Sequence, residues 1–146
     1  MDAVTALLKV MYNKTNNDYM KIDHIAMFVK DLEKAKAFFT KYFGAESNDM
    51  YYNPRTGLKT YFLSFGDGSR LEIMSRPDTV ERPQSTLLTG YIHISFSVGG
   101  RETVDSMTEM LARDGYETVS GPRVTGDGYY ESCVSGPEGC LLEITE

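Results

Sequence analysis

An internal duplication is the feature that most constrains the fold of this chain. The chain contains only two histidines, His24 and His93, which are 69 residues apart, and Glu72 and Glu143 are 71 residues apart. Each histidine lies in a segment whose apolar residues alternate as in a β-strand, and so does each glutamate. Two copies of so long a repeat predict a pair of similar modules rather than a solenoid.

Both copies show the same order of predicted elements. In the first copy, the periodicity predicts a strand at 21–29, a helix at 31–43 and strands at 47–52, 59–65 and 69–75. In the second, it predicts a strand at 91–98, a helix at 101–114 and strands at 117–120, 129–135 and 140–145. Asp31 is the expected N-cap of the first helix, and Gly44 is expected to end it. The expected fold class is α+β, with two tandem βαβββ modules forming a curved mixed sheet around a cleft.

The composition predicts one folded domain and excludes several kinds of partner. We expect an N-terminal extension at 1–20 and a single domain at 21–146, with module one at 21–75, a linker at 76–90 and module two at 91–146. The net charge is −6 and the basic residues are scattered, which argues against nucleic-acid and anionic-membrane partners. No apolar run approaches the roughly 20 residues of a membrane span. Without a recognisable signal peptide, the two cysteines are expected to be free thiols in a cytoplasmic protein.

Four polar side chains are predicted to share one face of the strands. Aliphatic neighbours flank the two glutamates and His93 on both sides, and His24 on one side. Because successive side chains on a strand point to opposite faces, the four must point away from the covering helices. A lone histidine or glutamate is usually structural or solvated, but the joint pattern favours a divalent metal bound by His24, Glu72, His93 and Glu143. Asp23 is interpreted as a strand-start residue, with a supporting role behind His24 as the alternative.

The segment H24-I-A-M-F-V-K-D-L-E-K-A-K-A-F-F-T-K-Y-F-G44 resembles the opening module of the vicinal oxygen chelate (glyoxalase/bleomycin resistance/dioxygenase) superfamily, also called VOC. L71-E-I-M-S75, H93-I-S-F-S-V98 and G136-P-E-G-C-L-L-E-I-T145 are similar to its other motifs, so the resemblance covers about residues 21–146. The complete His–Glu–His–Glu set resembles that of glyoxalase I (lactoylglutathione lyase). The resemblance implies a homodimer with a metal-containing cleft.

The implied reaction is a proton transfer in a small-molecule substrate such as a hemithioacetal, a thiol adduct of a 2-oxoaldehyde. It would pass through an enediolate that the metal stabilises, with Glu143 as the preferred base and Glu72 as the alternative. One divalent metal per site is expected: the N₂O₂ donor set suits Ni, Co or Zn, and also Mn or Fe. The sequence leaves open whether a site forms within one chain or between two.

This chain departs from the glutathione-dependent pattern at two positions. Bacterial members carry Arg four residues after the first histidine and Asn four residues after the first glutamate, where this chain has Phe28 and Arg76. The candidate substrate-binding residues are Phe28, Arg76, Arg123 and Tyr130. Two alternatives remain: an antibiotic-type binding protein without catalysis, and a three-ligand relative such as a dioxygenase or thiol transferase.

Overall fold

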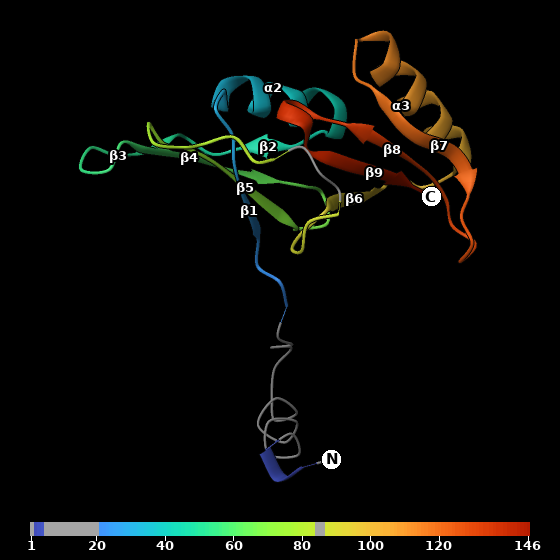
Figure 1. The fold of residues 1–146 in the computed structure, drawn as a ribbon, viewed down its shortest axis with the longest axis horizontal. Helices are drawn as coiled ribbons and strands as arrows, with labels where there is room; N and C mark the ends of the chain where they lie inside the picture. Colours follow the sequence, from blue (N-terminus) through green and yellow to red (C-terminus); the bar gives the residue numbers. More distant parts are fainter. Residues whose placement is uncertain (1, 5–20, 84–86) are drawn as a thin grey trace.

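The computed structural model describes residues 2–4, 21–83 and 87–146, which contain two modules with similar element order (Figure 1). The first module consists of β1 (Ile25–Phe28), α2 (Leu32–Phe43), β2 (Glu46–Ser47), β3 (Tyr51–Asn53), β4 (Leu58–Ser64) and β5 (Arg70–Ser75). The second consists of β6 (His93–Ser97), α3 (Arg101–Arg113), β7 (Thr118–Val124), β8 (Tyr130–Ser135), the 3₁₀ turn η1 (Pro137–Gly139) and β9 (Leu141–Thr145). Apart from residues 2–4, the expected N-terminal extension lies outside the described residues.

Each module forms a mixed sheet of its own. The strand order is β1-β5-β4-β2 in the first sheet, where β3 also pairs with β4, and β6-β9-β8-β7 in the second. In each module, the strand that comes first in the sequence pairs in parallel with the strand that comes last: β1 with β5, and β6 with β9. The other strand pairs are antiparallel. Figure 1 shows both helices on the same side of the sheets. The prediction of an α+β fold with two tandem modules is confirmed.

Several predicted strands have different bounds in the structure, and the strand expected at 21–29 is shortened to β1 at Ile25–Phe28. The strand expected at 47–52 is divided into β2 and β3. Between them, the side chain of Asn48 replaces a backbone carbonyl as the hydrogen-bond acceptor for the neighbouring strand β4. Its Oδ1 accepts a hydrogen bond from the backbone N–H of Phe62, at 2.8 Å. In the second module β7 continues past residue 120, and Arg123 pairs with Glu131 and Val124 with Tyr130.

The two helices begin and end largely where the sequence predicts. Asp31 caps α2 by accepting a hydrogen bond from the N–H of Lys34, and Gly44 ends it in the left-handed conformation that glycine adopts without strain. In α3, Thr108 is buried with the apolar residues Val104 and Leu111. The hydroxyl of Thr108 is satisfied there, 2.6 Å from the carbonyl oxygen of Val104 and 2.6 Å from the hydroxyl of Ser132. Apolar periodicity alone did not indicate this buried polar pair.

Aromatic side chains join the two modules into one core. The ring of Phe96 on β6 lies among three rings of the first module, with centroid distances of 4.2 Å to Phe43, 5.3 Å to Phe65 and 6.3 Å to Phe39. Tyr116 makes a similar contact with Phe38, at 4.8 Å. Such tilted and edge-to-face pairs contribute roughly 0.5–1.5 kcal/mol each beyond the area they bury. The relative orientation of the modules is therefore determined by packed rings.

A carboxylate adds a directional contact between the modules. Glu138, in the η1 turn, accepts hydrogen bonds at 2.8 Å from the backbone N–H groups of Lys30 and Asp31, at the start of α2. Glu138 has a positive φ of 53°, which is unusual for a residue with a side chain. A carboxylate beside these N–H groups also interacts favourably with the helix dipole. The contact compensates for the backbone strain that the turn requires.

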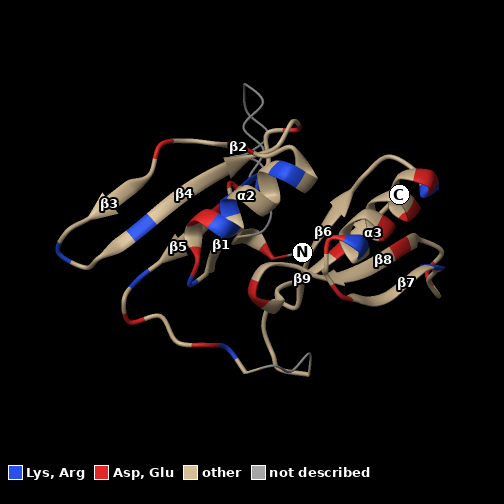
Figure 2. Ribbon diagram, turned by 90° about the horizontal axis from the view of Figure 1, so that it is seen from above, with Lys and Arg blue, Asp and Glu red and all other residues tan. Residues whose placement is uncertain are grey.

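The charged residues are spread over both modules. In Figure 2, acidic and basic residues are interspersed along the helices, the strands and the connecting loops. Within the described residues, no helix has the length and apolar character needed to cross a membrane.

Substitution of Glu138 should show how much this contact stabilises the chain. We expect Glu138→Ala to lower the free energy of unfolding by about 1–2 kcal/mol, because it removes charge-assisted hydrogen bonds and keeps the positive φ. Glu138→Gly should lower it less, because glycine adopts this conformation without strain. Urea unfolding followed by circular dichroism measures both. An alanine variant as stable as the parent chain would show that the contact contributes nothing.

Candidate functional site

In the first module, His24 and Glu72 form a pair on the sheet face opposite the helices. Glu72 lies on β5 between Leu71 and Ile73, which are 3% and 0% exposed in the core. His24 directly precedes β1, which pairs with β5 in parallel register. The Nε2 atom of His24 is 3.6 Å from Oε2 of Glu72. Burial of the two flanking aliphatic residues thus directs the carboxylate toward the imidazole.

The second module repeats this arrangement. Glu143 lies on β9 between Leu142 and Ile144, which are both 0% exposed. His93 begins β6, the parallel neighbour of β9, and its Nε2 atom is 3.6 Å from Oε2 of Glu143. The two pairs therefore have the same geometry at equivalent positions of the two modules.

The structure brings the four candidate ligands together as two pairs. Within the part of the chain that the structure describes, no group of three or more His, Cys, Asp and Glu side chains is close enough to hold a metal ion. The imidazoles of His24 and His93 are 36% and 38% exposed, so each pair is open to a further partner. We call the pair His24–Glu72 half-site one and the pair His93–Glu143 half-site two.

Asp23 supports the imidazole of half-site one. Its Oδ2 atom is 2.8 Å from Nδ1 of His24 and also pairs with the guanidinium of Arg70. The hydrogen bond with His24, and then that with Arg70, lowers the pKa of the Asp23 carboxyl below its usual value. Asp23 lies outside β1, which begins at Ile25, so the structure favours the supporting role over that of a strand-start residue.

Ser95 and Glu131 lie beside the carboxylate of half-site two. The hydroxyl of Ser95 donates a hydrogen bond to Oε1 of Glu143, at 2.6 Å. Burial, and then the nearby charge of Glu143, raises the pKa of the Glu131 carboxyl. Sequence reasoning missed both residues. Ser95 follows His93 by two positions and therefore shares its face of the strand, a signal that the alternation already contained.

The four expected substrate-binding residues have different surroundings. Phe28 is 51% exposed, on the same face of β1 as His24. The guanidinium of Arg76 donates two hydrogen bonds to Asp78, at 2.8 and 2.9 Å. Its Nε and Nη2 atoms are therefore already engaged and do not bind an anionic substrate group. Arg123 is exposed on β7, opposite Glu131.

Tyr130 lies away from the half-sites. Its hydroxyl donates a hydrogen bond to Asp105 of α3, at 2.6 Å, and the guanidinium of Arg101 lies over its ring. Because neighbouring Glu131 faces Glu143, the alternation of β8 places Tyr130 on the helix side of the sheet. The expectation that Tyr130 binds substrate therefore lacks support from its position.

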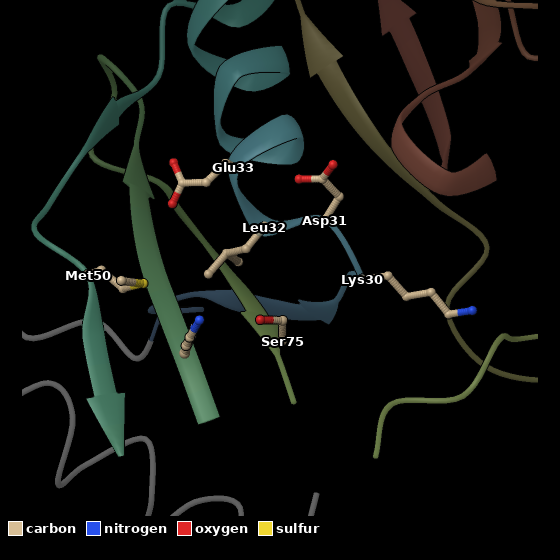
Figure 3. Close-up of a pocket in the computed structure, with 7 residues that line it drawn as sticks. Lys30, Asp31, Leu32, Glu33, Met50 and Ser75 are labelled. Carbon is tan, nitrogen blue, oxygen red and sulfur yellow. The ribbon is translucent and has the colours of Figure 1, made fainter. Parts of the chain in front are cut away.

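A shallow pocket at the start of α2 is separate from both half-sites. It is lined by Lys30, Asp31, Leu32, Glu33, Met50, Lys59 and Ser75 (Figure 3). Its charged groups are largely engaged by neighbours: Lys30 pairs with Glu81 at 2.6 Å, and Glu33 accepts a hydrogen bond from Tyr61 at 2.7 Å. The lining contains none of the four candidate ligands.

Comparison with known proteins identifies the family of the chain. The sequence model of the Glyoxalase/Bleomycin resistance protein/Dioxygenase superfamily matches residues 21–144. The chain belongs to this superfamily. The resemblance inferred from the motifs is thereby confirmed, and the superfamily match includes both half-sites.

One relative by sequence and two solved structures are similar to the chain. YwkD, an uncharacterized protein of Bacillus subtilis (strain 168), is 32% identical over 97 residues, which cover 66% of this chain and 73% of YwkD. The fosfomycin resistance protein FosX of Listeria monocytogenes, solved with Mn(II) and sulfate, is 24% identical with a TM-score of 0.66, covering 87% of this chain and 92% of FosX. The trypanothione-dependent glyoxalase I of Leishmania major is 18% identical with a TM-score of 0.71, covering 88% and 87%. At these identities the two structures establish the shared fold alone.

The two cysteines of the described chain are free thiols whose reactivity we expect to differ. Burial raises the pKa of Cys140 to about 12, with a smaller contribution from the charge of Glu138. Burial also raises the pKa of Cys133, which lies opposite Glu143 in the ladder. At pH 8 both should be alkylated by iodoacetamide more slowly than in the urea-unfolded chain, and Cys140 more slowly than Cys133, because the thiolate is the reactive form. Peptide mapping over time measures this order, and equal rates in folded and unfolded chains would contradict it.

Proposed function

We propose that the protein is a metal-dependent isomerase of the glyoxalase I type, acting on a hemithioacetal or a similar adduct of a 2-oxoaldehyde. The observation that carries the proposal is the pair of equivalent half-sites, each with Nε2 and Oε2 atoms 3.6 Å apart on an open sheet face. A non-catalytic binding protein has no need of two carboxylates paired with two imidazoles. The free thiols support a reducing, cytoplasmic setting.

The donor atoms of the half-sites suit a divalent cation. Two ligands about 2.1 Å from one ion lie about 3.0–3.4 Å apart, so the observed 3.6 Å needs only a small closure. Together the half-sites supply two imidazole nitrogens and two carboxylate oxygens, a set compatible with Ni, Co, Zn, Mn or Fe. When bound, the cation would polarise substrate oxygens and stabilise negative charge that develops on them. The metal ligands would be His24, Glu72, His93 and Glu143.

The carboxylates would also move the proton. Glu143 or Glu72 would take a proton from one substrate carbon and return it to the neighbouring carbon. Phe28 and the engaged guanidinium of Arg76 provide little attraction for the anionic ends of a peptide thiol. We therefore propose a thiol partner that lacks the two carboxylates of glutathione.

We further propose that the complete site is shared between two copies of the chain in a homodimer. Each half-site supplies two ligands, too few for a firmly held ion, and each lies on a face with exposed apolar residues. Phe28, two residues after Ala26 on β1, is 51% exposed, and Tyr91, two residues before His93, is 84% exposed. In a twofold dimer, half-site one of each chain would meet half-site two of its partner. Burial of the apolar residues would favour this association.

Metal content tests the proposal most directly. After dialysis, elemental mass spectrometry should find about one Ni, Co or Zn per chain, because four donors converge at each shared site. His93→Ala should lose this metal, and Ser97→Ala, an exposed residue of the same strand that contacts no ligand, should keep it. Loaded protein should then isomerise hemithioacetals of some thiols. Absence of metal after reconstitution would overturn the isomerase and favour a binding protein, whereas firmly bound iron with oxygen chemistry would favour a dioxygenase.

Mixing two inactive variants tests the shared site. A heterodimer of His24→Ala and His93→Ala would contain one doubly altered site and one intact site. After unfolding and refolding of an equal mixture, about one quarter of all sites should be intact and bind metal, because half of the dimers are mixed. Each variant refolded alone is the control. If the mixture binds no more metal than the controls, each site forms within one chain and the shared arrangement is wrong.

A further inference from the structure

The two half-sites occupy equivalent positions but differ in the residue beside each glutamate. In the parallel ladders, Ala26 lies opposite Glu72 and Ser95 lies opposite Glu143. These two neighbours occupy the same place in the duplication, two residues after His24 and His93 respectively. The duplicated fold thus presents one carboxylate to a methyl group and the other to a hydroxyl group.

In half-site two, the described residues support the carboxylate rather than the imidazole. Ser95 donates its hydrogen bond to Oε1 of Glu143 at 2.6 Å, while Oε2 faces Nε2 of His93. One oxygen is therefore engaged by the hydroxyl, and the other faces the imidazole with which it would share a metal ion. Within the described residues, Nδ1 of His93 has no counterpart of the hydrogen bond that Asp23 makes with His24.

In half-site one, the support that the structure describes is on the imidazole rather than on the carboxylate. A carboxylate only accepts hydrogen bonds, so Nδ1 of His24 carries the hydrogen that bonds to Asp23. In the neutral ring, the lone pair of Nε2 then faces Glu72. Arg70 holds Asp23 in place. Glu72 receives no side-chain hydrogen bond from the residues the structure describes, because its ladder neighbour is Ala26.

From this complementary support we propose that Asp23 and Ser95 are positioning residues that fix His24 and Glu143 as permanent ligands, and that Glu72 is the ligand free to detach. The inference rests on the proposed function, since it assumes that the four ligands act together. A ligand held by a second hydrogen bond is oriented before it binds, which strengthens its contribution. An unsupported carboxylate can rotate away, open a position for a substrate oxygen and act as the base, so this inference favours Glu72 over Glu143 in that role.

Exchanging the two neighbours should exchange the roles of the glutamates. We compare Ser95→Ala, Ala26→Ser and the double exchange, with Ser97→Ala as the control, because Ser97 lies on the same exposed face of β6 without contacting a ligand. Loss of a group that orients a ligand typically weakens metal binding by about 10–100-fold, and we expect this for Ser95→Ala. Ala26 is exposed, so a serine hydroxyl has room to reach Glu72.

Two readouts separate positioning from a general effect on folding. Metal affinity is measured with Co(II) by competition with a chelator, and the visible spectrum of the Co(II) protein reports the coordination number. With the hemithioacetal of methylglyoxal and 2-mercaptoethanol present, the parent chain should change its spectrum as Glu72 detaches. Ala26→Ser should bind Co(II) at least as tightly as the parent chain, show a smaller change and have a lower kcat. The melting temperature of each metal-free variant should match that of Ser97→Ala.

The role of Asp23 is tested without metal. Because the chain has only two histidines, nitrogen-15 NMR can assign both ring tautomers, with His93→Ala identifying the signals of His24. The neutral ring of His24 should carry its hydrogen on Nδ1. In Asp23→Asn this preference should be lost, while the signals of His93 stay unchanged.

The outcomes distinguish this inference from the proposed function. A parent chain that binds no metal overturns the proposed function. A parent chain that binds metal, with Ser95→Ala binding it equally well, overturns only the positioning role of Ser95. Equal spectral changes in Ala26→Ser and the parent chain overturn the assignment of Glu72 as the detaching ligand. A His24 tautomer that is unaffected in Asp23→Asn overturns the role of Asp23.

Discussion

Burial of aliphatic residues on both sides of each glutamate is the constraint on which the rest of the structure depends. Leu71 and Ile73 in one module, and Leu142 and Ile144 in the other, are almost completely buried. A strand that slipped by one residue would expose these side chains and bury a carboxylate, at a cost of several kcal/mol. The register of both sheets is therefore firmly specified, and the outward direction of the glutamates follows from it.

The packing between the modules decides how the half-sites of one chain are oriented. Phe96 inserts among rings of the first module on the helix side, and Glu138 ties the η1 turn to the start of α2. These contacts use the side of the sheets that faces the helices, so the opposite faces, which carry the imidazoles and carboxylates, stay open. In a twofold dimer, both shared sites can close together only if every chain holds its modules at the same angle. A well-packed interface between the modules therefore favours assembly of complete sites.

Duplication explains the symmetry of the ligands, and small local differences explain how that symmetry is broken. The His–Glu distance is 3.6 Å in both half-sites, but a hydroxyl supports one carboxylate and an aspartate supports the other imidazole. The surfaces around them differ as well. Phe28 and Phe62 lie near half-site one, whereas Glu131 and Cys133 lie near half-site two. A substrate between the two surfaces would meet an apolar side and a polar side.

The sequence alone determined the α+β class, the tandem modules, the caps of α2 and the face on which the four candidate ligands lie. These properties follow from local periodicity, because burial of aliphatic residues specifies the face of a strand whatever its neighbours are. Tertiary structure decided which residues meet. Ser95 and Glu143 are distant in sequence and contact each other through the parallel pairing of β6 and β9, and Glu138 reaches Lys30 across the two modules. It also placed Tyr130 on the helix side and divided the ligands into pairs, because contacts between distant segments depend on sheet order and module packing rather than on local pattern.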